Sequence, residues 1–141
     1  MSIGIYILMR VVILGMGGFA AEVRTVVDKC THLDVVGFVD VLPRESDWYL
    51  GPIKWLDSNL ASSDVVMPAI GAVNRRSMTR RTAILEKLNA KFVNLCPPLL
   101  AETVVCEDAV STSSGAFSGH NVVLSVGCEL QSCVLVNTAA I

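Results

Sequence analysis

A six-residue repeat runs through the last third of the chain and restricts its fold more than any other feature. One position of each hexad is mostly aliphatic and falls on Leu100, Cys106, Thr112, Ser118, Leu124, Leu130 and Val136. The position four residues later is always small and apolar, and falls on Val104, Val110, Ala116, Val122, Cys128, Val134 and Ala140. Ordinary β-strands have a period of two, whereas short fixed repeats are typical of parallel β-helices. Three hexads make one triangular coil, so residues 98–141 are expected to form the first coils of a left-handed parallel β-helix.

The chain before this repeat alternates between short apolar runs and helical patterns. Residues 11–14 and 35–39 are runs rich in β-branched side chains, which is typical of buried parallel strands. Between them, Ala20, Val23 and Val27 recur at helical spacing. Strand, helix and strand in about 30 residues form a βαβ unit, whose two strands are parallel. The fold class is therefore α/β, and residues 1–97 are expected to form a small Rossmann-like domain with a parallel sheet.

The rest of this domain is predicted from weaker patterns. A third strand is expected at residues 65–70, near the sheet edge or with a bulge, because Pro68 cannot donate to a neighbouring strand. A helix follows at residues 74–89 and a fourth strand at residues 91–95, whereas residues 41–57 are expected to be irregular. Four side chains of the helix are expected to face inward: Met78, Ile84, Leu85 and Leu88. Pro97 and Pro98 mark the domain boundary.

Composition restricts the partners of the chain. Apolar residues make up 52% of it, charged residues 17%, and the net charge is −2. No Lys/Arg run stands out as a charged patch, so nucleic acid is not an expected partner. The apolar composition favours a homo-oligomer. The five cysteines contain no CxxC pair, which predicts free thiols in the cytoplasm and no metal site. The apolar N-terminal stretch is interrupted by Arg10 and is too short to cross a membrane.

A glycine-rich loop lies between the first strand and the first helix. Gly15 would permit a tight turn there, Gly17 would let a phosphate approach the backbone, and the N-terminus of the helix would attract an anion. Asp40 ends the second strand, where an acid can accept hydrogen bonds from ribose or base. The pattern does not distinguish NAD from a nucleotide-sugar, and a structural turn without a ligand is the alternative.

A second candidate lies after the third strand. Gly71 is followed by Arg75 and Arg76, which open the next helix, and an arginine there could bind a phosphate through two hydrogen bonds. A solvated basic helix face is the alternative, because Arg80 and Arg81 continue the basic run. His120 occupies a hexad position that is expected to point outward, which favours a surface role.

The chain as a whole resembles a family of bacterial sugar acyltransferases, which includes sialic acid O-acetyltransferases and UDP-4-amino-sugar N-acetyltransferases. The likeness is carried by the segments VVILGMGGFA at residues 11–20, VGFVD at 36–40, Ile70-Gly71 with Arg76, FVNL at 92–95 and VNTAAI at 136–141. The resemblance implies a nucleotide-sugar-binding domain, a trimerising β-helix, acetyl-CoA as co-substrate and a histidine as general base. The residues that match its nucleotide-sugar motifs are Gly15, Gly17, Gly18, Phe19, Asp40, Gly71 and Arg76. Asn137 matches an active-site asparagine.

Four departures from the family pattern qualify this expectation. Val41 replaces a second acid, Ala72 and Val73 replace small polar residues, and Cys96 replaces a histidine. The catalytic histidine of the family would fall beyond Ile141, so the chain is expected to be a truncated acetyltransferase. The alternatives are a non-catalytic nucleotide-sugar-binding or assembly module and, less favoured, an NAD-dependent oxidoreductase. An oligomer is expected, as a trimer or an end-to-end dimer.

Overall fold

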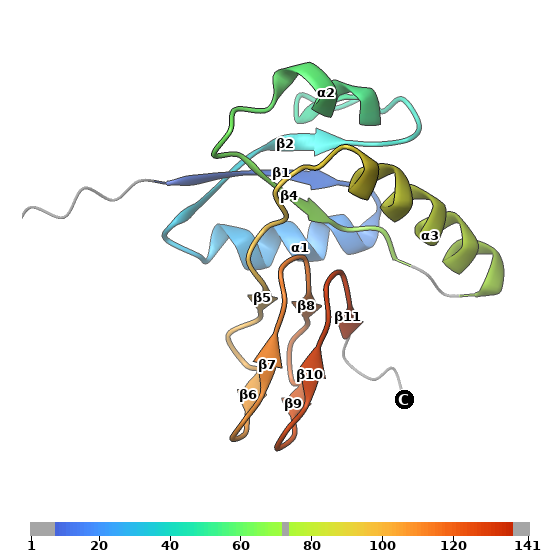
Figure 1. Ribbon diagram of the computed structural model, residues 1–141. Helices are drawn as coiled ribbons and strands as arrows, with labels where there is room; N and C mark the ends of the chain where they lie inside the picture. Colours follow the sequence, from blue (N-terminus) through green and yellow to red (C-terminus); the bar gives the residue numbers. More distant parts are fainter. Residues whose placement is uncertain (1–7, 72–73, 137–141) are drawn as a thin grey trace, which may run out of the picture.

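A computed structural model describes residues 8–71 and 74–136 of the protein, and Figure 1 shows their arrangement. A four-stranded parallel sheet has the order β3-β2-β1-β4, and its strands are β1 (Met9–Leu14), β2 (Leu33–Val39), β3 (Tyr49–Gly51) and β4 (Val65–Pro68). Three α-helices accompany it: α1 (Gly18–Asp28), α2 (Leu56–Asn59), which follows a 3₁₀ turn (Ile53–Trp55), and α3 (Arg75–Ala90). The predicted parallel-sheet α/β class is confirmed.

The two faces of the sheet are covered differently. Val11 and Ile13 of β1 pack with α1 and with the first part of the C-terminal region, whereas Val12 and Leu14 pack with α2 and α3. All four of these side chains are fully buried. A run of apolar residues without alternation is what a strand covered on both faces requires, which explains why β1 was predictable from the sequence.

Two predictions about this domain are wrong. Residues 41–57 contain β3, because Gly37 of β2 lets the neighbouring chain approach: a Cβ at Gly37 would lie 2.6 Å from the carbonyl oxygen of Trp48. Residues 91–95 do not form the fourth strand, and only a bridge from Leu95 to Val66 is present. The cause is the end of α3, where Phe92 has a φ of 54° and its N–H bonds to the carbonyl of Asn89.

The prediction for α3 is correct in extent but not in every buried side chain. Asn74 is the N-cap, and Ile84 and Leu88 are buried against the sheet as expected. Met78 is 51% exposed, because the first turns of α3 extend past the edge of the sheet (Figure 1). β4 is an edge strand, as Pro68 predicted.

The C-terminal region is a three-sided coil of very short parallel strands. These strands are β5 (Leu99–Leu100), β6 (Val105–Cys106), β7 (Ser111–Thr112), β8 (Phe117–Ser118), β9 (Val123–Leu124), β10 (Glu129–Leu130) and β11 (Leu135–Val136). β5, β8 and β11 form one side, β6 and β9 a second, and β7 and β10 a third. Leu99 pairs with Phe117 and Phe117 with Leu135, so one turn of the coil takes 18 residues.

The six-residue period has a backbone cause. Positive φ angles recur at every sixth residue, at Ala109, Gly115, Asn121, Gly127 and Cys133. Each of these residues turns a corner between two strands, and the small and aliphatic hexad positions then fall inside, where Ala116, Leu124 and Leu130 are buried. Cys106 occupies one of the mostly aliphatic hexad positions but is exposed, because it lies in the first turn, which has a neighbouring turn on one side only. Asn137 and Ala140 lie outside the described residues.

The sheet and the coil share an apolar core. Leu99, Ala101 and Phe117 of the coil belong to the same buried cluster as α1 and β1. The rings of Phe19 and Phe117 meet edge to face at 5.2 Å, and such a pair contributes about 0.5–1.5 kcal/mol beyond its buried area. The coil is therefore held at a defined position against α1, on the side that Figure 1 shows below the sheet.

Candidate functional site

A cavity of about 510 Å³ opens at the carboxyl ends of the sheet strands. The chain runs from β1 to β2 and β3 on one side and then returns to place β4 on the other side of β1. Such a reversal leaves a crevice above the strand ends, where open α/β sheets bind ligands. Its walls come from the loop after β1, the loops after β2 and β4, and the side chains of Arg80 and Ile84 on α3.

Six of the residues predicted for a nucleotide-sugar site meet around this cavity. They are Gly15, Gly17, Gly18, Phe19, Asp40 and Gly71, and they come from three loops that are far apart in the sequence. Arg76 is exposed on α3 and does not line the cavity. Asn137 lies outside the described residues. The structure thus brings the predicted binding motifs to one place, whereas it does not describe the predicted active-site asparagine.

The three glycines of the first loop differ in what the fold requires of them. Gly15 has a φ of 118°, and a Cβ there would lie 2.7 Å from the carbonyl oxygen of Ala69, so the turn needs a glycine. No described atom lies within 4 Å of a Cβ built on Gly17 or Gly18. Both glycines line the cavity and have open space where a Cβ would lie, so a phosphate could approach the backbone here.

No side chain of the described residues caps the N-terminus of α1. Gly17 is the N-cap and makes no side-chain capping bond, and the first turn of α1 contains no acidic residue. The first N–H groups of a helix have no partner within the helix, and the helix dipole places partial positive charge there. Gly17, Gly18 and Phe19 line the cavity, so this end of the helix can bind an anion inside it.

Asp40 directly follows β2, and both of its carboxylate oxygens accept hydrogen bonds within the protein. Its Oδ1 accepts a hydrogen bond from the N–H of Val41 at 2.7 Å, and its Oδ2 accepts one from Nε of Arg44 at 2.9 Å. The side chain of Asp40 is 13% exposed, whereas that of Arg44 is 44% exposed. Both residues line the cavity.

Sequence reasoning missed two arginines of the site, Arg44 and Arg80. Arg44 lies in the loop that was expected to be irregular, and its spacing of four residues from Asp40 is the only signal that could have suggested a pair. Arg80 lies one helical turn after Arg76, so the helical period places both on similar faces of α3. Of the two, Arg80 lines the cavity, because α3 passes the cavity at that turn.

Phe19 connects the cavity with the coil. Its side chain lines the cavity, lies 3.5 Å from a Cβ built on Gly71, and packs edge to face on Phe117 of β8. A Cβ at position 71 would therefore touch Phe19 at an ordinary van der Waals distance. The loops after β1 and β4 are positioned in part by the coil through this contact.

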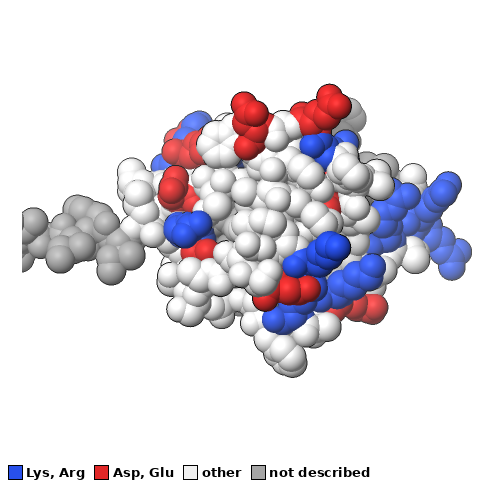
Figure 2. Space-filling view, turned by 90° about the horizontal axis from the view of Figure 1, so that it is seen from above, with Lys and Arg blue, Asp and Glu red and all other residues white. Residues whose placement is uncertain are grey.

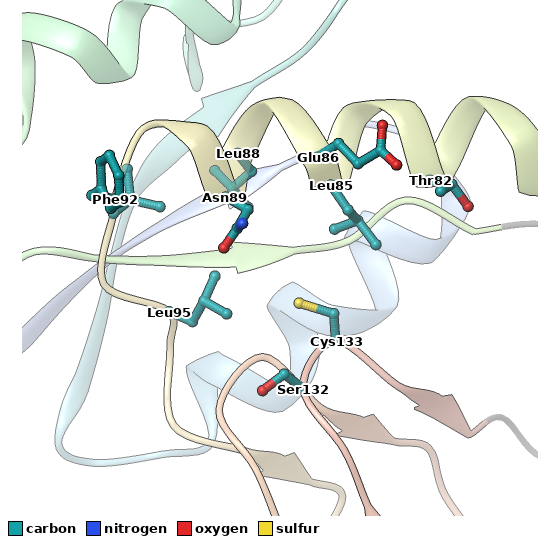
Figure 3. Close-up of a pocket in the computed structure, with 10 residues that line it drawn as sticks. Thr82, Leu85, Glu86, Leu88, Asn89, Phe92, Leu95, Ser132 and Cys133 are labelled. Carbon is teal, nitrogen blue, oxygen red and sulfur yellow. The ribbon is translucent and has the colours of Figure 1, made fainter.

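A second cavity lies between α3 and a corner of the coil. It measures about 630 Å³, and Figure 3 shows Leu85, Leu95 and Phe92 among its mainly apolar walls, with Ser132 and Cys133 of the coil below. Burial raises the pKa of the Cys133 thiol, an effect that Arg81 partly opposes. Among the described residues that line this second cavity, Glu86 is the charged one. Neither a glycine-rich loop nor the N-terminus of a helix contributes to the described lining. The first cavity is therefore the better candidate for a nucleotide.

Neither histidine of the sequence lines the first cavity. Nδ1 of His120 lies 2.9 Å from Oγ1 of Thr103, a contact between successive turns of the coil. Beside it, a hydrogen bond from Lys29 lowers the pKa of Glu102. This arrangement connects the coil to the end of α1 and lies apart from the glycine loop.

Within residues 8–71 and 74–136, no three His, Cys, Asp or Glu side chains lie close enough together to hold a metal ion. Over the same ranges, no helix has the length and apolar character needed to cross a membrane.

The fold matches solved acetyltransferase structures. One is a mutant of perosamine N-acetyltransferase from Caulobacter crescentus in complex with CoA and GDP-perosamine, with a TM-score of 0.76 and 20% identity; the match covers 91% of this chain and 60% of that one. Another is the acetyltransferase domain of PglB from Neisseria gonorrhoeae in complex with acetyl coenzyme A, with a TM-score of 0.74 and 21% identity, covering 94% and 63%. No protein-family model and no curated protein sequence matches the chain.

These matches confirm the resemblance to bacterial sugar acetyltransferases at the level of the fold. The sequence motifs pointed to this family, and the superposition extends over the sheet and the coil together. The chain spans about 60% of the length of the two solved structures.

Proposed function

From the shared fold and the geometry of the first cavity, we propose that the protein binds a nucleotide-activated sugar and belongs to the sugar acetyltransferases. The observation that carries this proposal is the meeting of the glycine loop, the uncapped N-terminus of α1 and two arginines around one cavity. The solved structure from Caulobacter crescentus contains GDP-perosamine, a nucleotide-sugar. In this chain, residues 1–97 form the binding domain and residues 98–141 belong to a left-handed β-helix of hexapeptide repeats.

Charge favours a phosphorylated ligand. Asp40 contributes one negative charge to the walls of the cavity, and Arg44 and Arg80 contribute two positive charges. Figure 2 shows basic side chains gathered over the N-terminal half of α3, where Arg75, Arg76 and Arg80 are exposed. Cations at the start of a helix are opposed by its dipole, so an anion bound beside them would relieve this repulsion. Arg76 then attracts the ligand from outside the cavity rather than lining it.

Acetyl transfer is the activity that we propose for the complete fold. The acyl donor would be acetyl-CoA, which is bound in the structure from Neisseria gonorrhoeae. A base must remove a proton from the attacking amine or hydroxyl of the sugar, and no histidine lines the described cavity. We assign Asn137 to the neighbourhood of that reaction and the general base to a histidine outside this chain, as the resemblance implies.

The assembly and the location of the protein are part of the same proposal. Val105 and Val123 pair across the outside of the coil and are 54% and 59% exposed. Exposed apolar residues in register favour contact with another subunit, as a trimer or an end-to-end dimer. The free cysteines fit a reducing cytoplasm.

The proposed function is tested by calorimetric titration of the protein with UDP, GDP, a UDP-amino sugar, CMP-sialic acid, acetyl-CoA and NAD. Binding of a sugar nucleotide, competed by the matching nucleoside diphosphate, is the expected result. Acetyl transfer is measured separately, by chromatographic detection of CoA. Sugar-nucleotide binding with no CoA released by this chain would favour the second candidate, a non-catalytic binding or assembly module. Binding of NAD alone, or of no ligand, would overturn the proposal.

A further inference from the structure

The ion pair between Asp40 and Arg44 gives the acid a different role from the one that its position on β2 predicts. An acid at the tip of this strand is expected to accept hydrogen bonds from ribose or base. Here, however, one carboxylate oxygen already accepts from the backbone of Val41 and the other from Nε of Arg44, at 2.7 and 2.9 Å. With a side chain that is only 13% exposed, Asp40 offers little of its carboxylate to a ligand.

Arg44, unlike Asp40, keeps hydrogen-bonding groups that a ligand can reach. It contacts Asp40 through Nε, and its two terminal Nη groups make no hydrogen bond to the described residues. Its side chain is 44% exposed and lines the cavity together with the N-terminus of α1 and Arg80. A guanidinium group that is held through Nε keeps two parallel donors, the arrangement that binds two oxygens of one phosphate.

Electrostatics explains why the acid and the arginine occur together. A bare carboxylate beside a phosphate site would repel the ligand, whereas a carboxylate paired with Arg44 is neutralised. The pair also fixes the direction of a long side chain whose immobilisation would otherwise weaken binding. Val41, in the position where related sequences often carry a second acid, adds no negative charge.

We infer that Arg44 binds the phosphate groups of the ligand, and that Asp40 is a positioning residue that holds Arg44 rather than a group that contacts ribose or base. This inference rests on the proposed function, because it requires that a nucleotide occupies the cavity. It assigns phosphate recognition to the N-terminus of α1, Arg80 and the Asp40–Arg44 pair.

A double-mutant cycle tests the inference in the intact chain. The affinities of UDP and uridine are measured by calorimetry and ligand-observed NMR for the unsubstituted protein, Asp40→Asn, Arg44→Gln and the double variant; GDP and guanosine replace them if GDP binds more tightly. Loss of a charged hydrogen bond to phosphate should make Arg44→Gln bind UDP about tenfold more weakly. Uridine binding should change less than about twofold, because uridine has no phosphate.

The effect of Asp40 should depend on Arg44. Asp40→Asn should weaken UDP binding by about three- to tenfold in the unsubstituted background, and by less than about twofold when Arg44 is already Gln. Arg44→Lys should show an intermediate loss, because lysine keeps the charge but not the paired donors. Lys54→Gln is the matched control: it removes one exposed positive charge that does not line the cavity, and UDP affinity should remain within about twofold. Melting temperatures verify that every variant is folded.

The outcomes separate the two levels of the proposal. Equal losses from Asp40→Asn in both backgrounds, with uridine weakened as much as UDP, would show that Asp40 contacts ribose or base and would overturn the inference while leaving nucleotide binding intact. Failure of the unsubstituted protein to bind UDP or GDP would overturn the proposed function itself.

Discussion

Gly15 and Gly17 lie two residues apart in the same loop, but the fold requires only one of them to be glycine. Gly15 combines a φ of 118° with a carbonyl oxygen 2.7 Å from the position of a Cβ. Gly17 has φ and ψ values of −80° and −170°, which any residue adopts, and open space at its Cβ position. Sequence inspection assigned the tight turn to the first and the ligand approach to the second, and the backbone geometry agrees with the first assignment.

Alanine substitutions at these two glycines should separate stability from binding. Gly15→Ala should lower the free energy of unfolding by at least about 2 kcal/mol, through backbone strain and the clash with Ala69. Gly17→Ala should change it by less than about 1 kcal/mol, because a small loss of capping is offset by reduced freedom of the unfolded chain. It should nevertheless weaken nucleotide binding about tenfold, since the methyl group would separate phosphate from the N–H donors. Urea unfolding and calorimetry measure both, and unchanged nucleotide affinity in Gly17→Ala would contradict the placement of the ligand.

Cys96 should make stability depend on alkaline pH. Burial, and to a lesser degree the nearby Cys30, raises the pKa of its thiol from 9.0 to about 12. Below about pH 9 the thiol is protonated in both states; between pH 9 and 12 the unfolded chain loses the proton while the folded protein keeps it, so stability falls as pH rises. The difference in unfolding free energy between the wild type and Cys96→Ala should therefore shrink above pH 9, by at most about 1.4 kcal/mol per pH unit. A difference that stays constant would contradict this, and Cys106→Ala, at an exposed cysteine, is the control.

Among the helices and strands, α3 shows that the ends of a helix and its buried face are determined differently. Its start is local: the side chain of Asn74 accepts from the N–H of Ser77, and the side chain of Ser77 accepts from the N–H of Asn74. Its end is also local, at the left-handed Phe92. Between them, however, only Ile84 and Leu88 reach the core, because tertiary packing decides how far the helix overlaps the sheet.

Removal of the cap should measure how much the start of α3 contributes. Asn74→Ala should lower the free energy of unfolding by about 1 kcal/mol, because the N–H of Ser77 loses its acceptor. Asn89→Ala, near the end of the same helix and exposed, should change it by less than about 0.5 kcal/mol. Urea unfolding followed by circular dichroism compares the two, and equal losses would show that the cap is not the cause.

At the scale of the whole molecule, the sheet and the coil are joined by a few specific contacts. Arg81 donates from Nε to the carbonyl of Ile70, beside the cavity, and from Nη2 to the carbonyl of Cys133, at a corner of the coil. Phe19 and Phe117 form the apolar part of the same joint. The sequence suggested only an alternative for Arg81, a solvated basic helix face, because a contact across 52 residues has no local signal.

Loss of the two hydrogen bonds of Arg81 should weaken the contact between the sheet and the coil. Arg81→Ala should lower the free energy of unfolding by about 1–3 kcal/mol, because two carbonyl groups lose a charged donor. It should also increase tryptic cleavage after Lys91, at the start of the segment that passes from α3 to the coil. Lys87→Ala, an exposed cation of the same helix, should do neither. Unchanged stability together with an unchanged cleavage rate would show that the joint depends on apolar packing alone.

The sequence by itself determined the features that depend on local periodicity. Three features each reflect a repeating backbone geometry, which gives the same sequence pattern wherever it occurs. They are the apolar run of β1, the helical spacing of α1 and the six-residue repeat. Gly15, Gly17, Asp40 and Gly71 could be predicted for a similar reason, because glycines and an acid at strand ends have a recognisable place in parallel sheets. Gly18 and Phe19 were named through the family resemblance.

Only the tertiary structure decided what depends on contacts between distant segments. β3 exists because Gly37 lets a short, unremarkable segment approach β2. Arg80 lines the cavity and Arg76 does not, because α3 crosses the sheet at one particular turn. Arg44 reaches Asp40 through a loop without periodicity. In each case the stabilising contact joins two segments whose separation along the chain is not fixed. No local pattern in the sequence could therefore specify the contact.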